Sequence, residues 1–131
     1  MTSDKELKSV LQKAGKDWNY DSFKVEEMTD KHALSRLAMY ICKDILQTKE
    51  AIGLSDEVLS NYFELIESQY KDNPYHNATH GGEVAHSTLY FISNSFMKDF
   101  LDDHENFAAL IACLGHDVGH SGFNNRYLVN N

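Results

Sequence analysis

The sequence has little of what membrane, secreted and nucleic-acid-binding proteins carry. Its longest apolar run, residues 107–115, is too short to cross a bilayer, and its first residues contain no apolar signal segment. Lys and Arg number 12 against 20 Asp and Glu, so the formal net charge is −8. This acidic balance disfavours binding to nucleic-acid phosphates or to an anionic membrane surface. We therefore expect no nucleic-acid partner and no membrane insertion.

Cysteine and proline are also scarce, with two and one residues respectively. Cys42 and Cys113 both fall within apolar helical patterns, so we expect buried, reduced thiols instead of a disulfide. Reduced thiols together with the missing signal segment predict a cytoplasmic protein. The length of 131 residues suits one domain, and 42% hydrophobic with 24% charged residues is typical of a folded protein.

Apolar residues recur at helical spacing almost throughout the chain, and no segment alternates as a half-buried strand does. The pattern predicts an all-α fold, a multi-helix array. Five helices are expected at roughly 3–15, 30–45, 56–70, 77–97 and 102–114, the last one opened by a capping box of Asp102 and Glu105. The segment 18–28 is expected to be irregular and pinned to the core by Trp18, Tyr20 and Phe23.

Six of the seven histidines fall between His76 and His120. In the first group, His76 and His80 are four residues apart and share one face of a helix, with Glu83 near that face. In the second group, His116 stands beside Asp117, and His120 follows one helical turn later. Imidazole and carboxylate ligands together suit Zn²⁺, Mn²⁺ or Fe²⁺, and Mg²⁺ where water completes the coordination. The two spaced pairs therefore favour a metal site.

Other notable residues have plainer interpretations. We expect three histidines to be surface or packed residues, namely His32, His86 and His104. We expect three acids to form a solvated helix face, namely Glu57, Glu64 and Glu67. Gly81 and Gly82 together cost a helix about 1 kcal/mol each relative to alanine. That cost is tolerable where another helix or a ligand approaches closely; alternatively, the helix begins after them.

The histidine groups resemble those of the class I 3′,5′-cyclic nucleotide phosphodiesterases, within the HD-type metal-dependent phosphohydrolases. The first matching motif is Tyr75-His76-Asn77-x-x-His80, followed by Glu83-Val84. The second is Ala-Leu-Ile-Ala-Cys-Leu-Gly-His116-Asp117-Val118-x-His120-x-Gly122-x-x-Asn125. The upstream segment from Trp18 to Leu34 is similar to the start of the family's catalytic domain, so the resemblance covers nearly the whole chain.

This resemblance implies hydrolysis of cAMP or cGMP to the 5′-monophosphate, in signal transduction, at a centre of two divalent ions, Zn²⁺ with Mg²⁺ or Mn²⁺. It implies that His76 is the general acid for the leaving 3′ oxygen. It implies that His80, His116 and Asp117 are metal ligands, and that His120 lies near the second metal and the phosphate. The remaining positions that it assigns to the substrate pocket or to support of the ligands are Tyr75, Glu83 and Asn125.

The chain departs from the family at Gly119, where an acid is usual, at Ser121, where proline is common, and at 81–83, where Ala-x-Asp is favoured. The family's last metal-ligating aspartate and its purine-clamping glutamine lie beyond residue 131. We therefore expect residues 1–131 to be a partial phosphodiesterase catalytic domain, truncated at its C-terminus, with apolar faces open to self-association or to a missing C-terminal segment. Two alternatives stay open: a catalytically incomplete metal- or partner-binding protein, and an HD-type phosphohydrolase for another nucleotide.

Overall fold

The computed structural model describes residues 2–70, 77–116 and 118, and every element within these ranges is helical, which confirms the all-α prediction. The α-helices are α1 (Thr2–Leu11), α2 (Ser22–Met28), α3 (Ala33–Tyr40), α4 (Thr48–Ile52), α5 (Asp56–Ser68), α6 (Ala78–Ser93) and α7 (Asp103–Gly115). A π-helical turn, η1 (Ile41–Ile45), continues α3, and a 3₁₀ turn, η2 (Phe96–Asp99), follows α6. No helix in the described ranges has the length and apolar character that crossing a membrane requires.

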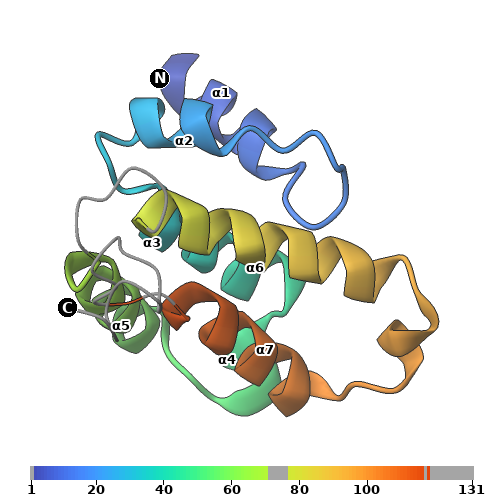
Figure 1. Ribbon diagram of the computed structural model, residues 1–131. Coiled ribbons are helices and arrows are strands. Elements are labelled where there is room, and N and C mark those ends of the chain that lie inside the picture. The colour runs from blue at the N-terminus through green and yellow to red at the C-terminus, as the bar shows by residue number, and fades with distance from the viewer. Residues whose placement is uncertain (1, 71–76, 117, 119–131) are drawn as a thin grey trace, which may run out of the picture.

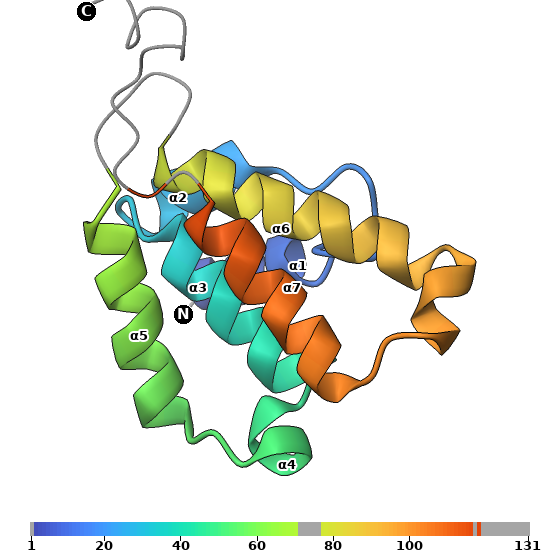
Figure 2. The ribbon, with the colours of Figure 1, turned by 60° about the horizontal axis from the view of Figure 1, so that its bottom comes forward.

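Helix α3 is the centre of the array, as Figures 1 and 2 show. It packs against α5 on one side and against α6 on the other, and α6 lies alongside α7. Helices α1 and α2 cover the remaining side of α6 (Figure 1). The apolar face of α3 is consequently buried from its first turn into η1, at positions Leu34, Leu37, Ala38 and Ile41.

Partners from every neighbouring helix complete this core. Phe63 of α5, Leu89 of α6, and Leu110 and Leu114 of α7 are all at most 4% exposed. Both cysteines are free thiols, as the sequence predicted; Cys42 is buried in η1, but Cys113 in α7 is only partly buried, which the sequence did not predict. Because it is buried, the pKa of the Cys42 thiol rises to about 11, so this thiol is unreactive at neutral pH.

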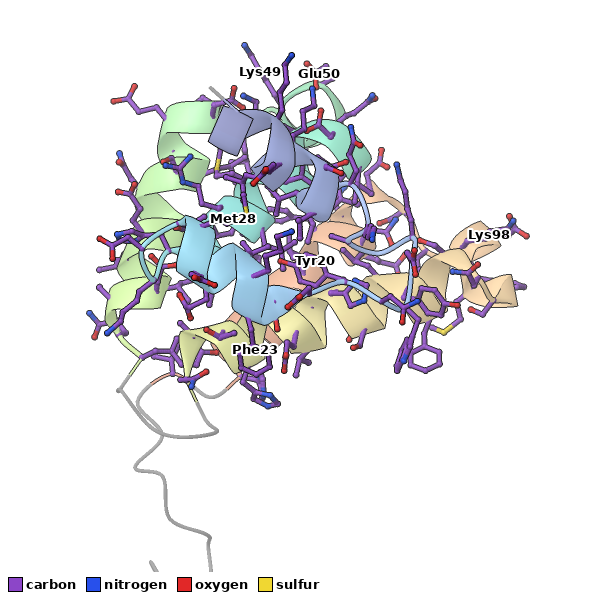
Figure 3. The ribbon with its side chains drawn as sticks, turned by 90° about the horizontal axis from the view of Figure 1, so that it is seen from above. Tyr20, Phe23, Met28, Lys49, Glu50 and Lys98 are labelled. Carbon is purple, nitrogen blue, oxygen red and sulfur yellow. The ribbon has the colours of Figure 1, made fainter. Side chains whose placement is uncertain are left out.

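The prediction for residues 18–28 is wrong in part. Residues Ser22–Met28 form α2, whose first turn is capped by the Asp21 side chain accepting from the Lys24 amide at 3.0 Å. Trp18 and Phe23 are 56% and 74% exposed, so neither is a core anchor. Figure 3, which labels both Tyr20 and Phe23, views this side of the molecule. Three of the seven residues of this short helix are charged, and a segment with only two buried positions has almost no hydrophobic period.

The number of helices and several boundaries also differ from the prediction. The described residues hold seven α-helices instead of five, α4 was not expected, and α1 ends at Leu11 instead of near residue 15. The second long helix begins at Ala33, because Asp30 and Lys31 have left-handed φ values of 52° and 69° that no helix accommodates. The fourth helix ends at Ser93, and Ser95 then caps η2 by accepting from the Met97 amide at 3.2 Å. A serine side chain can offer the backbone this alternative to a continuing helix.

Candidate metal centre

His80 and His116 meet at one end of the α6–α7 pair. His80 lies in the first turn of α6 and His116 is the C-cap residue of α7. Because the two helices lie antiparallel and side by side, these distant positions become neighbours (Figure 2). Their ring centroids are 5.3 Å apart, and the rings are inclined at 62°.

Local sequence signals fix where the two helices begin. Asn77 caps α6, since its side-chain oxygen accepts from the His80 amide at 3.0 Å. The predicted capping box opens α7: Asp102 accepts from the Glu105 amide at 2.8 Å, and Glu105 accepts from the Asp102 amide at 3.3 Å. The position of His80 along α6 therefore follows from where that helix begins, whereas the capping box of α7 lies at the opposite end of that helix from His116.

Gly81 lets the two helix ends come close together. A Cβ atom at this position would lie 2.6 Å from the Tyr70 hydroxyl oxygen and 3.1 Å from the Leu114 carbonyl oxygen. The Tyr70 hydroxyl donates to that same carbonyl at 2.5 Å, which ties the end of α5 to the end of α7. A Cβ atom at Gly82 would lie 3.4 Å from Cδ2 of Leu37, which is an ordinary van der Waals contact. Both glycines lie inside α6, so the close-approach interpretation is confirmed and the later helix start is wrong.

The histidine pair fits a divalent metal. The His116 Nδ1 atom lies 2.7 Å from the Cys113 carbonyl, which can only accept, so Nδ1 carries the proton and Nε2 would be the nitrogen that binds a metal. Metal-binding histidines generally donate their second N–H in this way. Two imidazoles on one tetrahedral ion, at about 2.1 Å per bond, have their centroids about 5 Å apart. The observed 5.3 Å matches this spacing.

Most of the other predicted site residues lie outside the described residues, namely Tyr75, His76, Asp117, His120 and Asn125. Within the described residues no three His, Cys, Asp or Glu side chains converge as a metal-binding group. Of the predicted ligands, the structure thus brings together His80 and His116, and the other assignments stay predictions.

Glu83 is directed toward the N-terminal segment. Its carboxylate accepts a short hydrogen bond from the Ser22 hydroxyl in the first turn of α2. Burial and then the charge of Glu83 raise the pKa of the neighbouring Tyr20 phenol. Ser22 was absent from the sequence analysis, and only a known contact between α2 and α6 could have revealed it.

His86 is a packed histidine, as predicted. It is 4% exposed, its Nδ1 accepts from the Gly15 amide at 2.8 Å, and its ring lies 4.8 Å from that of Tyr20. Burial lowers the pKa of His86, so the imidazole is neutral in the folded protein. This hydrogen bond ties the turn after α1 to the middle of α6.

The solvated-face prediction is wrong for Glu67. The Glu67 side chain is only 9% exposed. Its carboxylate accepts hydrogen bonds from Nδ1 of His32 at 2.6 Å and from the Ser35 amide at 2.9 Å. This hydrogen bond and the Glu67 charge raise the pKa of His32. Glu57 and Glu64 are exposed, as expected. The carboxylate of Glu67 thus holds the start of α3 against α5.

Comparisons with known proteins agree with this arrangement. Residues 75–131, which include both histidines, match the family described as 3′5′-cyclic nucleotide phosphodiesterase. A mouse protein named high affinity cAMP-specific and IBMX-insensitive 3′,5′-cyclic phosphodiesterase 8A is 39% identical over 86% of this chain and 14% of its own length. The 3′,5′-cyclic-AMP phosphodiesterase 4 of Dictyostelium discoideum is 35% identical over 87% of this chain and 11% of its own length.

A rat relative, 3′,5′-cyclic-AMP phosphodiesterase 4C, is 30% identical over 86% of this chain and 21% of its own length. The chain thus spans between 11% and 21% of the length of these three curated relatives. The family match covers the paired histidines, and the mouse relative matches 86% of the chain, so the likeness also extends upstream of residue 75. By these matches, the chain belongs to the 3′5′-cyclic nucleotide phosphodiesterase family.

Proposed function

We propose that this chain contributes the N-terminal part of a catalytic domain that hydrolyses 3′,5′-cyclic nucleotides to 5′-monophosphates in signal transduction. One observation carries the proposal: the centroids of the His80 and His116 rings are 5.3 Å apart, a spacing at which both imidazoles can bind one divalent ion. Both lie within the residues that match the family. The named relatives act on cAMP, which makes cAMP the first substrate to test and cGMP the second.

In this proposal His80, His116 and Asp117 hold metal. Two bound divalent ions would supply an activated water and neutralise charge on the phosphate. His76 would donate its proton to the leaving 3′ oxygen, because an alkoxide is a poor leaving group unless protonated. His120 would lie beside the phosphate. The pocket would be lined or supported by three further residues, Tyr75, Glu83 and Asn125.

The described residues would prepare this chemistry by holding geometry. The Cys113 carbonyl fixes the tautomer of His116. The Asn77 side chain, which accepts from the His80 amide, caps the first turn of α6 that carries His80. The Tyr70 hydroxyl ties the end of α5 to the end of α7 through the Leu114 carbonyl. The two free cysteines suit a reducing compartment, so we place the activity in the cytoplasm.

The first test is hydrolysis of cAMP and cGMP by the purified 131-residue chain with Mg²⁺, Mn²⁺ or Zn²⁺. Turnover by the unmodified chain should be lost in His76→Ala and in His116→Ala. His104→Ala is the matched control, because His104 is exposed on the first turn of α7 and away from the histidine pair. Turnover that survives in His116→Ala would overturn the assigned roles.

A second measurement separates metal binding from catalysis. Co²⁺ bound by imidazole gives visible absorption bands, so titration with Co²⁺ reports the site without any substrate. We expect His80→Ala and His116→Ala each to weaken Co²⁺ binding by at least about tenfold, and His104→Ala to leave it unchanged. Tight Co²⁺ binding without hydrolysis in the unmodified chain would favour the alternative, a catalytically incomplete metal-binding protein.

A further inference from the structure

An apolar groove lies at the opposite end of the α6–α7 pair from the histidines. It is formed by the C-terminal half of α6, by η2 and by the first turns of α7, and has a volume of about 560 Å³. Its apolar lining comprises Phe91, Ile92, Met97, Leu101, Ala108 and Ala109. Two polar residues also border it: Thr88, whose hydroxyl accepts from the Cys113 thiol at 3.3 Å, and Glu105.

Large apolar side chains around this groove face solvent. Phe91, Met97 and Phe100 are 61%, 42% and 75% exposed. Trp18, itself 56% exposed, contacts Phe91 edge to face at 5.8 Å and extends the apolar surface toward the N-terminal segment. Burying one such side chain is worth about 1.5–3 kcal/mol, so leaving several exposed side by side is typical of a binding surface.

The stretch of chain that supplies the lining residues Met97, Leu101 and Glu105 is acidic. Asp99 stands between the lining residues Met97 and Leu101, and the exposed Asp102 and Asp103 stand between Leu101 and Glu105. Lys98 is the cation that shares this stretch, and it projects outward at the η2 end of the molecule (Figure 3). His104, which is exposed, follows Asp103 in the same stretch.

This charge pattern discriminates between occupants. A second copy of the chain would bring another such acidic stretch and a further net charge of −8 against the first, which opposes association. A partner with Lys or Arg beside its apolar residues would instead be attracted. An apolar trough between helices with charged edges is the usual receptor for an amphipathic helix, which inserts side chains spaced three and four residues apart.

We propose that this groove binds the apolar face of a basic amphipathic helix from a partner protein. Leu-sized side chains of that helix would occupy the space over Ala108 and Ala109, where the α7 surface is lowest. Its Lys or Arg side chains would face Asp99, Asp103 and Glu105 of the acidic stretch. The groove lies about 20 Å from the histidine pair along the 16-residue α6, so this proposal stands independently of the metal centre.

The test uses a fluorescent synthetic helix of about 18 residues, with Leu on one face and Lys on the other, titrated with the 131-residue chain. A peptide with the same Leu positions and Glu in place of Lys is the matched probe control. We expect binding of the Leu/Lys peptide that weakens as salt is raised, and at least about tenfold weaker binding of the Leu/Glu peptide. Equal binding of the two peptides would overturn the charge argument.

Variants locate the binding site. Met97→Glu puts a charge into the groove and is expected to weaken binding of the Leu/Lys peptide by about tenfold or more. The double variant Asp99→Lys/Asp103→Lys leaves the capping box intact. It is expected to weaken binding of the Leu/Lys peptide and to reduce the dependence of that binding on salt. Leu65→Glu is the control, because Leu65 is 58% exposed on α5, away from the groove. Circular dichroism checks that each variant folds.

Two outcomes would refute the proposal. The first is a loss of peptide binding in Leu65→Glu equal to that in Met97→Glu, since binding would then not reside in the groove. The second is a concentration-dependent dimer of the unmodified chain, seen by analytical ultracentrifugation, that Met97→Glu abolishes. In that case the groove is covered by a second copy and not by a basic helix.

Discussion

The two ends of the α6–α7 pair differ although the same two helices form both. At the histidine end, Gly81 has no side chain, and the Tyr70 hydroxyl enters the space that a Cβ would fill. At the other end, the helices leave a groove of about 560 Å³, with Phe91 and Met97 exposed beside it. One end is closed by a third element, and the other is open.

This difference corresponds to two kinds of task. Holding two imidazoles at one spacing requires that the helix backbones keep fixed positions. A small residue at the close approach and the hydrogen bond from Tyr70 to Leu114 both favour this. Capturing a partner requires apolar surface that stays accessible until the partner arrives. The change of character along α6, from Gly81 to Phe91, therefore separates a positioning end from a binding end within one helix.

Truncating a core side chain at each end should give the largest contrast. Leu114 is fully buried at the histidine end, so Leu114→Ala is expected to lower the free energy of unfolding by about 3 kcal/mol. Ile92 at the groove end is only partly buried, so Ile92→Ala is expected to cost about 1 kcal/mol. Urea unfolding followed by circular dichroism measures both. Equal costs would mean that the groove end is packed as tightly as the histidine end.

The two neighbouring glycines test the close approach directly. Gly81→Ala would displace the Tyr70 hydroxyl and press on the Leu114 carbonyl, so we expect a loss of about 2 kcal/mol in stability. Gly82→Ala is the matched control. Its Cβ would meet Cδ2 of Leu37 at 3.4 Å and Cα of Leu34 at 3.9 Å, both ordinary contacts. Better helix propensity offsets them, so we expect a change within about 0.5 kcal/mol. A neutral Gly81→Ala would contradict the close approach.

Removing only the hydroxyl of Tyr70 should have a smaller effect. Tyr70→Phe keeps the ring but loses the hydrogen bond to the Leu114 carbonyl, which we expect to cost about 1 kcal/mol. The informative measurement is the contact between the His80 and His116 ring protons by nuclear Overhauser effect. We expect this contact to weaken in Tyr70→Phe and to persist in Tyr62→Phe, a control on the exposed side of α5. An unchanged contact would show that Gly81 alone sets the spacing.

Much of the positioning end could be predicted from the sequence. Hydrophobic periodicity gave α6 and α7, and the capping box of Asp102 and Glu105 gave the start of α7. The glycine pair indicated a close approach before any neighbour was known. These signals are local, so they do not depend on which helices meet.

The remainder depended on contacts between segments distant in sequence. Glu67 has the pattern of a solvated acid until α3 places His32 and Ser35 against it. Tyr70 fits the apolar stripe of α5 equally well as a core residue or as the wedge at Gly81. The helix α2 has too few buried residues to show a period. The groove likewise could not be inferred, because it exists only where α6 ends at Ser93 and the chain turns through η2.

The smallest expected effect concerns His86, which lies on α6 between the two ends. Burial lowers its pKa in the folded protein, while the unfolded chain has the ordinary histidine value of about 6.5. The unfolded state therefore binds more protons, so the stability from neutral His86 is complete above about pH 6.5 and declines as pH falls below that value. Protonation would also prevent Nδ1 from accepting the Gly15 amide.

Comparing unfolding free energies at about pH 5.5 and about pH 7.5 checks this sign. His86→Gln offers Gly15 an amide acceptor that does not titrate, so we expect a smaller loss of stability at the lower pH than in the unmodified chain. The exposed His32 has a pKa raised by Glu67, so its contribution has the opposite sign and is lost as pH rises through that raised value. The comparison is therefore made in a His32→Gln background. If the His86→Gln chain keeps the full pH dependence, the titrating group lies elsewhere, and the middle of α6 is not fixed to the turn after α1 through a neutral imidazole.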